Sequence, residues 1–96
     1  KSYGIPDTNV IDVLNKSNAR SYISESRFPN NILNGKFNGK STIKNLKKDL
    51  KMMNSILKNS KSKKKYTELS NQILSKIDDK LNMEDFTNIY KMWDKI

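Results

Sequence analysis

Apolar residues recur at helical spacing through the second half of the chain. Three runs, residues 43–57, 66–81 and 83–96, carry them at steps of three and four. Ser41 or Thr42 can cap the first run, and Asn82 can cap the last, with Asp85 three positions later. The apolar positions that define the runs are Ile43, Leu46, Leu50, Met53, Ile56 and Leu57, then Tyr66, Leu69, Ile73, Leu74, Ile77 and Leu81, then Met83, Phe86, Ile89, Tyr90, Trp93 and Ile96. The pattern predicts three amphipathic helices.

The first 40 residues carry weaker signals. Pro6 and Asp7 precede a short apolar stripe, which predicts a helix over residues 8–16. Residues 21–28 can add a helical turn or two, which we expect Pro29 to stop. The triplet Asn-Gly-Lys then occurs twice, and Asn-Gly favours tight turns, so residues 29–41 are predicted to form an irregular loop or a small hairpin.

These elements predict an all-α fold. An apolar stripe on a helix must be covered, and stripes with this spacing pack best in a small bundle. We therefore expect one helical domain over residues 1–96, with a loosely structured part at 1–40 and a helical core at 41–96. Because the chain starts at Lys1 and not at Met, we also expect it to be a fragment of a larger protein.

Composition narrows the possible chemistry. The 96 residues include neither Cys nor His, which excludes disulfides and removes the commonest metal ligand and general base. The acidic pairs Asp78-Asp79 and Glu84-Asp85 have no neighbour that would separate their pKa values, so we interpret them as solvated helix surface. No catalytic residue, cofactor or metal site is predicted, and no apolar run is long enough for a transmembrane segment. The lack of Cys favours an intracellular location.

Positive charge is concentrated in one stretch of the chain. The formal net charge is +9, and residues 41–65 alone hold nine Lys and one Asp. The 17 Lys, 13 Asn and single Ala are also what codon use in an AT-rich genome, such as that of a parasite or a large virus, would produce. Two interpretations therefore stay open, a solvated helix face and a surface that attracts DNA, RNA or another anionic surface. The lysines of this surface are Lys44, Lys47, Lys48, Lys51, Lys58, Lys63, Lys64 and Lys65.

A glycine-containing loop precedes the lysine-rich helix. Gly39-Lys40-Ser41 matches the end of a phosphate-binding loop, but Asn34 stands where that motif needs its first Gly, and no strand is predicted before it. Lys36, Lys40 and an exposed Phe37 would suit an unpaired base or a phosphate. A plain surface turn explains the segment as well.

The last predicted helix is rich in aromatic residues and Met. Phe86, Ile89, Trp93 and Ile96 fit one buried line, so Tyr90 and Met92 are the expected exposed members. Tyr, Trp and Met are enriched at interface centres, and we take Tyr90, Met92 and Trp93 as the candidate partner-binding residues.

The hypothesis from sequence is a non-enzymatic, helical protein–protein interaction module of a larger multi-protein complex, whose partner is another protein. The alternative is a nonspecific DNA- or RNA-binding domain, for example in a replication or transcription factor, that uses the lysine-rich helix.

Overall fold

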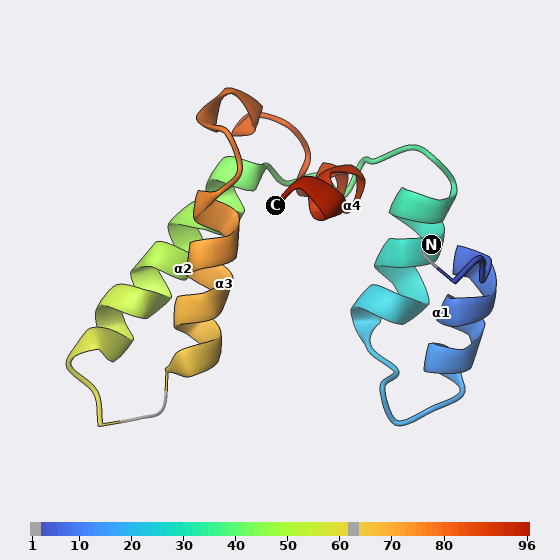
Figure 1. Ribbon diagram of the computed structural model, residues 1–96, viewed down its shortest axis with the longest axis horizontal. Helices are drawn as coiled ribbons and strands as arrows, with labels where there is room; N and C mark the ends of the chain where they lie inside the picture. Colours follow the sequence, from blue (N-terminus) through green and yellow to red (C-terminus); the bar gives the residue numbers. More distant parts are fainter. Residues whose placement is uncertain (1–2, 62–63) are drawn as a thin grey trace. The chain divides into compact units, whose positions relative to one another are not determined.

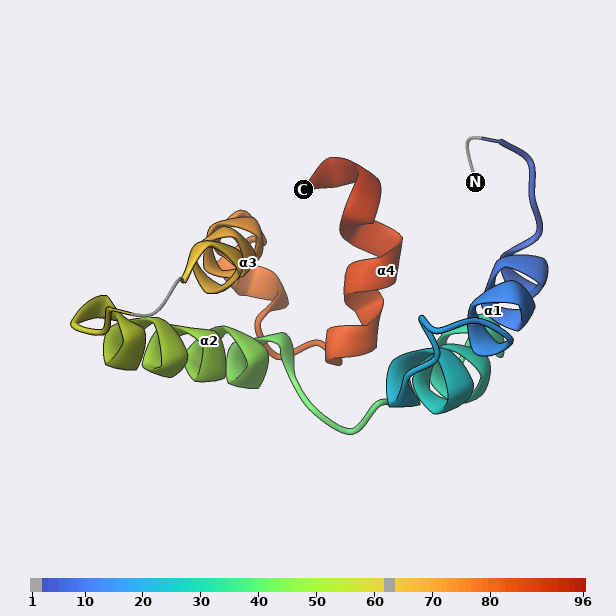
Figure 2. The same ribbon diagram turned by 90° about the horizontal axis from the view of Figure 1, so that it is seen from below.

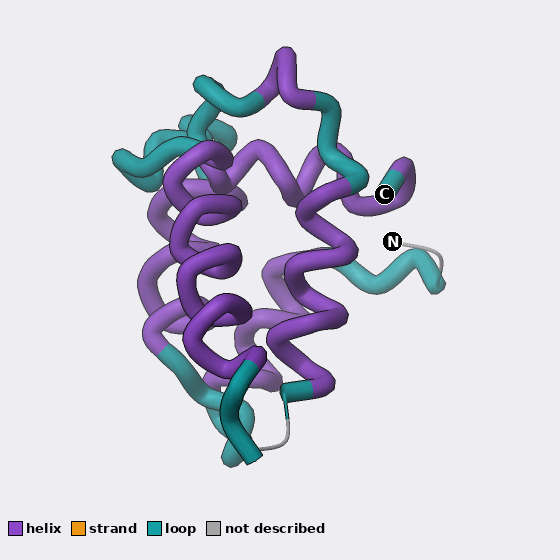
Figure 3. The backbone as a smooth tube through the Cα atoms, turned by 90° about the vertical axis from the view of Figure 1, so that its left-hand side faces the viewer, coloured by secondary structure: helices purple, strands orange, loops and turns teal. Residues whose placement is uncertain are grey.

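The protein, described by a computed structural model over residues 3–61 and 64–96, is built from helices and loops, as the tube in Figure 3 shows for the described residues. In chain order the elements are α1 (Asp7–Asn15), η1 (Ile23–Leu33), α2 (Ile43–Lys58), α3 (Lys65–Ser75), η2 (Asp79–Leu81), η3 (Phe86–Asn88), α4 (Ile89–Met92) and η4 (Trp93–Lys95). The predicted all-α class is confirmed. The chain divides into two compact units, Lys1–Gly39 and Lys40–Ile96, which are described separately below.

Helices α2 and α3 form an antiparallel pair in the second unit (Figures 1 and 2). Thr42 caps α2, because its hydroxyl accepts a hydrogen bond from the Asn45 N–H at 3.2 Å. The helix ends at Lys58, where the apolar spacing gives way to a lysine- and serine-rich connection. The structure therefore confirms the amphipathic helix that the sequence predicts over residues 43–57.

The core of the second unit lies between these two helices and the C-terminal segment. Ile43 is completely buried, and Leu74 and Ile77 join it in the centre of the core. Partly buried side chains from α2, η2, η3, α4 and the C-terminus pack around this centre: Leu46, Leu50, Leu81, Phe86, Ile89, Met92 and Ile96. Farther along α2, Met53 and Ile56 are exposed and Leu57 is half-buried, so the predicted stripe is covered best in the N-terminal half of the helix.

The two C-terminal elements differ from the predicted helices 66–81 and 83–96. Helix α3 ends at Ser75, and residues 76–78 turn before the short η2. Asn82 does not cap the last helix; Asp85 does so, by accepting a hydrogen bond from the Thr87 N–H at 3.0 Å. The cap therefore lies three residues later than predicted, and the last helix is divided into η3, α4 and η4.

In the first unit α1 packs against η1, and Ile11 of α1 and Ser24 of η1 are buried. The prediction that Pro29 stops the helix is wrong, because η1 continues through Pro29 to Leu33. In an α-helix the proline ring clashes with the carbonyl four residues earlier, whereas η1 has the wider π-helical pattern, in which the bonded carbonyl lies five residues back. Residues 29–33 therefore belong to a helix and not to a loop or hairpin.

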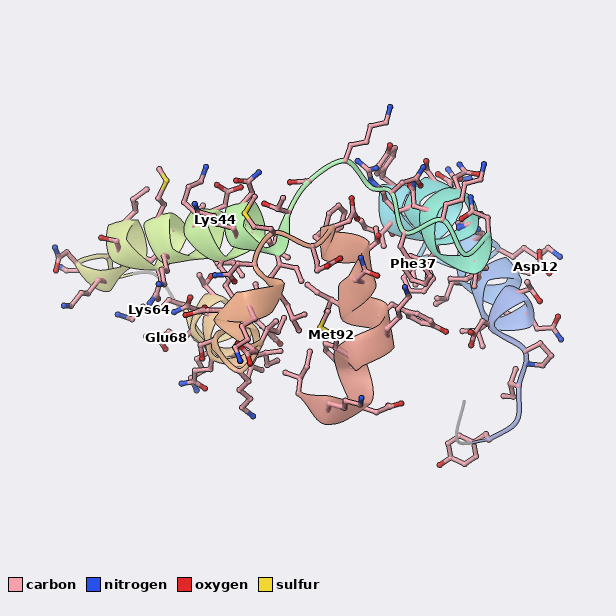
Figure 4. All side chains as sticks on the ribbon, turned by 90° about the horizontal axis from the view of Figure 1, so that it is seen from above. Asp12, Phe37, Lys44, Lys64, Glu68 and Met92 are labelled. Atoms are coloured by element: carbon pink, nitrogen blue, oxygen red, sulfur yellow. The ribbon has the colours of Figure 1, made fainter. Side chains whose placement is uncertain are left out.

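The segment after η1 is an irregular loop that folds back on the helix. The Phe37 N–H donates to the Asn31 carbonyl at 2.7 Å, and the Arg27 guanidinium donates to the Gly39 carbonyl at 3.0 Å. Gly35 has the positive φ expected of Asn-Gly, but at the second triplet it is Lys40, with φ 64°, that takes this conformation. Phe37 is half-buried (labelled in Figure 4) and is not the exposed aromatic that the sequence suggested.

Among the described residues, the structure has no helix that is both long and apolar enough to cross a membrane.

Two isoleucines of α2 test where the core ends. Ile43→Ala removes a fully buried side chain and should lower the free energy of unfolding by about 2–5 kcal/mol, whereas Ile56→Ala, at a residue 68% exposed, should change it by about 0.5 kcal/mol or less. Urea denaturation followed by circular dichroism measures both values. Equal losses in the two variants would contradict this placement of the core.

Candidate functional site

The start of α2 is joined to the segment 82–86 by a set of backbone hydrogen bonds. The Ile43 N–H donates to the Glu84 carbonyl at 2.9 Å, and the Lys44 N–H donates to the Asn82 carbonyl at 2.8 Å. In the opposite direction, the Phe86 N–H donates to the Ser41 carbonyl at 2.9 Å. Residues far apart in sequence are thereby held in a fixed register, which sequence periodicity could not show.

Asp85 closes this junction through its side chain. One carboxylate oxygen accepts the Lys40 N–H at 2.8 Å, and the other accepts both the N–H and the hydroxyl of Thr87, which is 2% exposed. The sequence predicts a solvated helix surface for Glu84-Asp85, but Asp85 is half-buried and holds two segments together. A carboxylate bonded in this way is a structural group and not a free acid or base.

A surface hollow of about 310 Å³ lies beside the junction, lined by Lys40, Ser41, Thr42, Asn45, Met83 and Asp85. The hydroxyl of Thr42 and the carboxylate of Asp85 are used within the protein. The Lys40 ammonium, the Ser41 hydroxyl and the Asn45 amide make no side-chain hydrogen bond to the described residues, so they are available to a ligand. Met83, 73% exposed, supplies an apolar wall.

Most N–H groups at the N-terminus of α2 are not available to an anion. A helix has four N–H groups without an intrahelical partner, and these commonly bind phosphate. In α2 three of them are already used: the Ile43 N–H donates to the Glu84 carbonyl, the Lys44 N–H to the Asn82 carbonyl and the Asn45 N–H to the Thr42 hydroxyl. Gly39-Lys40-Ser41 therefore does not work as a phosphate-binding loop, although its lysine lines the hollow.

The predicted lysine-rich surface divides into two sets of side chains. Lys44, Lys48, Lys51, Lys58 and Lys65 are exposed, and Lys44 is labelled on α2 in Figure 4. Two others, Lys47 and Lys64, are turned toward the protein. The Lys64 ammonium lies 3.6 Å from the Glu68 carboxylate, and Figure 4 shows the two side chains next to each other. Lys63 lies outside the described residues. The eight lysines are thus not one continuous exposed ridge.

Lys47 stabilises the turn after α3. Its side chain is only 13% exposed, and its ammonium donates to the Ile77 carbonyl at 2.7 Å and to the Asp79 carboxylate at 3.1 Å. The ammonium thereby supplies a donor to a carbonyl of the turn and a positive charge close to the C-terminal end of α3, where the helix dipole favours a cation. The hydrogen bond from Lys47, followed by one from Asn82, lowers the pKa of Asp79 below its ordinary value.

The candidate partner-binding residues have a different arrangement from the expected one. Met92 packs on the core and lies on the side of α4 toward α3 in Figure 4, whereas Trp93, expected in the buried line, is 60% exposed. Tyr90 is half-buried. The spacing predicts one continuous helix. In the structure the chain changes from α4 to the tighter η4 at Trp93, so the side chains of η4 point in other directions than a continuous α-helix would give them.

The comparison with protein families decides the class of the chain. Residues 1–93 match the family model described as NAD-binding of NADP-dependent 3-hydroxyisobutyrate dehydrogenase. The chain belongs to this dehydrogenase family. No curated protein and no solved structure matches it.

Membership of the dehydrogenase family corrects three predictions made from sequence. The chain was predicted to be a non-enzymatic interaction module, with a nucleic-acid-binding domain as the alternative, and not to be an enzyme; the family match contradicts all three predictions. The physical reason is that lysine content and amphipathic spacing report charge and helix packing, which helical parts of enzymes share with binding modules. No short motif in the sequence signals the family.

The described residues of this dehydrogenase-family chain do not form a dinucleotide cradle. Such a cradle is commonly a strand, a Gly-x-Gly-x-x-Gly turn and a helix whose free N–H groups face the pyrophosphate. The whole sequence has three glycines, at 4, 35 and 39, and the described part has no strand. Three of the four N–H groups at the start of α2 are already bonded, so the pyrophosphate of NAD or NADP does not fit there.

A pH titration tests the contact between Lys47 and Asp79. The pKa of Asp79 is lower in the folded protein than in the unfolded chain. The ionised carboxylate therefore stabilises the fold fully at pH values above the unfolded pKa, near 3.8, and this stabilisation is lost as the pH falls through the lower folded pKa. In NMR titrations of the side-chain carboxyls, Lys47→Ala should raise the pKa of Asp79 toward its ordinary value. Lys48→Ala, at the adjacent residue, should leave it unchanged; an identical effect of both variants would show that general positive charge is the cause.

Hydrogen exchange tests the role of Asp85 at the junction. Asp85→Ala removes the acceptor of the Lys40 and Thr87 N–H groups, so these two amides should exchange roughly five- to thirty-fold faster. Glu84→Ala is the matched control, because Glu84 contributes only backbone atoms to the α2 junction. Unchanged exchange in Asp85→Ala would show that the backbone bonds alone hold the segment.

Proposed function

We propose that this chain is a helical part of an NADP-dependent hydroxy-acid dehydrogenase and that the hollow at the start of α2 binds the carboxylate of the acid. The family match supports the reaction class. The observation that carries the binding role is the placement of the Lys40 ammonium, the Ser41 hydroxyl and the Asn45 amide around one hollow.

The chemistry of a small hydroxy acid suits these groups. Its carboxylate needs a positive charge and hydrogen-bond donors, which Lys40, Ser41 and Asn45 supply. The Asp85 carboxylate, which would repel the ligand, has both oxygens engaged by Lys40 and Thr87 N–H groups and by the Thr87 hydroxyl. The methyl of a branched acid can contact Met83, an exposed apolar side chain in the same lining.

The junction gives the hollow a fixed floor. The Lys40 backbone is held by Asp85, and Ser41 by Phe86, so the two side chains start from determined positions. A ligand group then meets donors whose backbone is already ordered, which reduces the entropy lost on binding. The hydrogen bonds of the junction and of the Thr42 cap also occupy the N–H groups of Ile43, Lys44 and Asn45. This supports anion binding by side chains and not by the helix terminus.

Binding of 3-hydroxyisobutyrate to the 96-residue chain tests this proposal. In NMR titrations the amide signals of residues 40–45 should shift on addition of the acid, and Lys40→Ala should weaken the affinity about ten-fold, because a charge-assisted hydrogen bond is lost. Lys58→Ala removes the same charge at the far end of α2 and should leave the affinity unchanged.

Two outcomes would contradict the proposal. Equal weakening by Lys40→Ala and Lys58→Ala would show that the acid is attracted only by net charge. Shifts confined to residues outside the hollow would place the acid elsewhere. Isobutyrate, which has the carboxylate but no hydroxyl, is a useful second ligand, since the proposal expects it to shift the same signals.

A further inference from the structure

A second surface of the unit Lys40–Ile96 is apolar and has no covering element among the described residues. Ile73, Trp93 and Ile96 line a shallow hollow of about 170 Å³, where the C-terminus comes beside α3 in Figures 1 and 2. Trp93 is 60% exposed and Leu69, one turn before Ile73, is 52% exposed. Large exposed side chains of this kind, gathered around a hollow, are typical of an interface.

The apolar surface continues along α3. Tyr66, Leu69 and Ile73 are separated by three and four residues, so they lie on one face of the helix over a length of about 10 Å. Tyr66 is 88% exposed. Together with Trp93 and Ile96 they form a strip, named here the α3 strip, whose length matches two turns of an amphipathic helix.

The edges of the α3 strip are positively charged. Lys65 and Lys76 stand four residues before and seven residues after Leu69, on the same side of α3, and Lys95 lies between Trp93 and Ile96 in the chain. All three are exposed, and none forms an ion pair with another described residue. Asp94 adds one negative charge beside them, and the unit as a whole holds 14 Lys against 7 Asp and Glu.

From this combination we infer that the α3 strip is a docking surface for an acidic amphipathic helix of a partner polypeptide. The apolar face of such a helix would cover Leu69, Ile73 and Trp93, and its carboxylates would meet the surrounding lysines. A second copy of the same strip fits less well, because a symmetric contact would bring like charges together. The inference is independent of the hollow at the start of α2, which lies on other residues.

Fluorescence anisotropy with a designed peptide tests the inference. The probe is a fluorescein-labelled helix of about 18 residues with Leu at steps of three and four and Glu elsewhere; its counterpart has Lys in place of Glu. The acidic peptide should bind the chain and the basic one should not. Leu69→Ala and Trp93→Ala should each weaken binding about five- to thirty-fold, with helical circular dichroism unchanged.

Two further variants distinguish specific binding at the α3 strip from nonspecific binding. Met52→Ala alters an equally exposed residue on the side of α2 opposite its core face and should change the affinity less than two-fold. The double variant Lys65→Glu, Lys76→Glu should weaken the acidic peptide and strengthen the basic one. Three results would overturn the inference. Both peptides could bind equally, or Met52→Ala could abolish binding. Sedimentation could also show that the wild-type chain self-associates and that Leu69→Ala and Trp93→Ala abolish this self-association.

Discussion

The unpaired N–H groups at the start of α2 impose the constraint on which the second unit depends. A buried donor without an acceptor costs about 1–3 kcal/mol, so these groups need partners when the completely buried Ile43 draws the first turn into the core. The carbonyls of Asn82 and Glu84 supply two of these partners, and the Thr42 hydroxyl supplies a third. Satisfying this helix end therefore fixes where the segment 82–86 runs, and through Asp85 it fixes Lys40 as well.

The same constraint relates packing to function in this dehydrogenase-family chain. Hydrogen bonds that bind segment 82–86 to α2 remove the helix terminus from the groups that could hold a phosphate. They also arrange side chains of Lys40, Ser41 and Asn45 around a hollow of defined lining. The use of backbone donors for folding thus contributes both to the proposed carboxylate site and to the lack of a dinucleotide cradle among the described residues.

The lysines of this protein have different structural roles, which cannot be inferred from how many lysines the sequence contains. Lys47 and Lys64 bond to carbonyls and carboxylates of their own unit, while neighbouring Lys44, Lys48 and Lys65 remain in solvent. The long apolar stem of lysine allows either arrangement. Lys47 lies on the core-facing side of α2, where its ammonium reaches the Ile77 carbonyl just beyond the end of α3. This position decides the role of Lys47, which a count of charges cannot reveal.

Spacing alone determined that the chain is helical, that a helix capped by Ser41 or Thr42 covers residues 43–57, and that Ile43 and Leu46 face the core, because these features depend on neighbours within one helix. Only the tertiary structure decided that α3 ends at Ser75, that Asp85 and not Asn82 caps the last helix, and that Met92 is covered while Trp93 is exposed. Pro29 within η1 belongs to this second group. The end of α3 and the burial of Met92 depend on contacts between segments distant in the sequence, whereas Pro29 fits because η1 has the wider π-helical bonding pattern; a sequence pattern records neither.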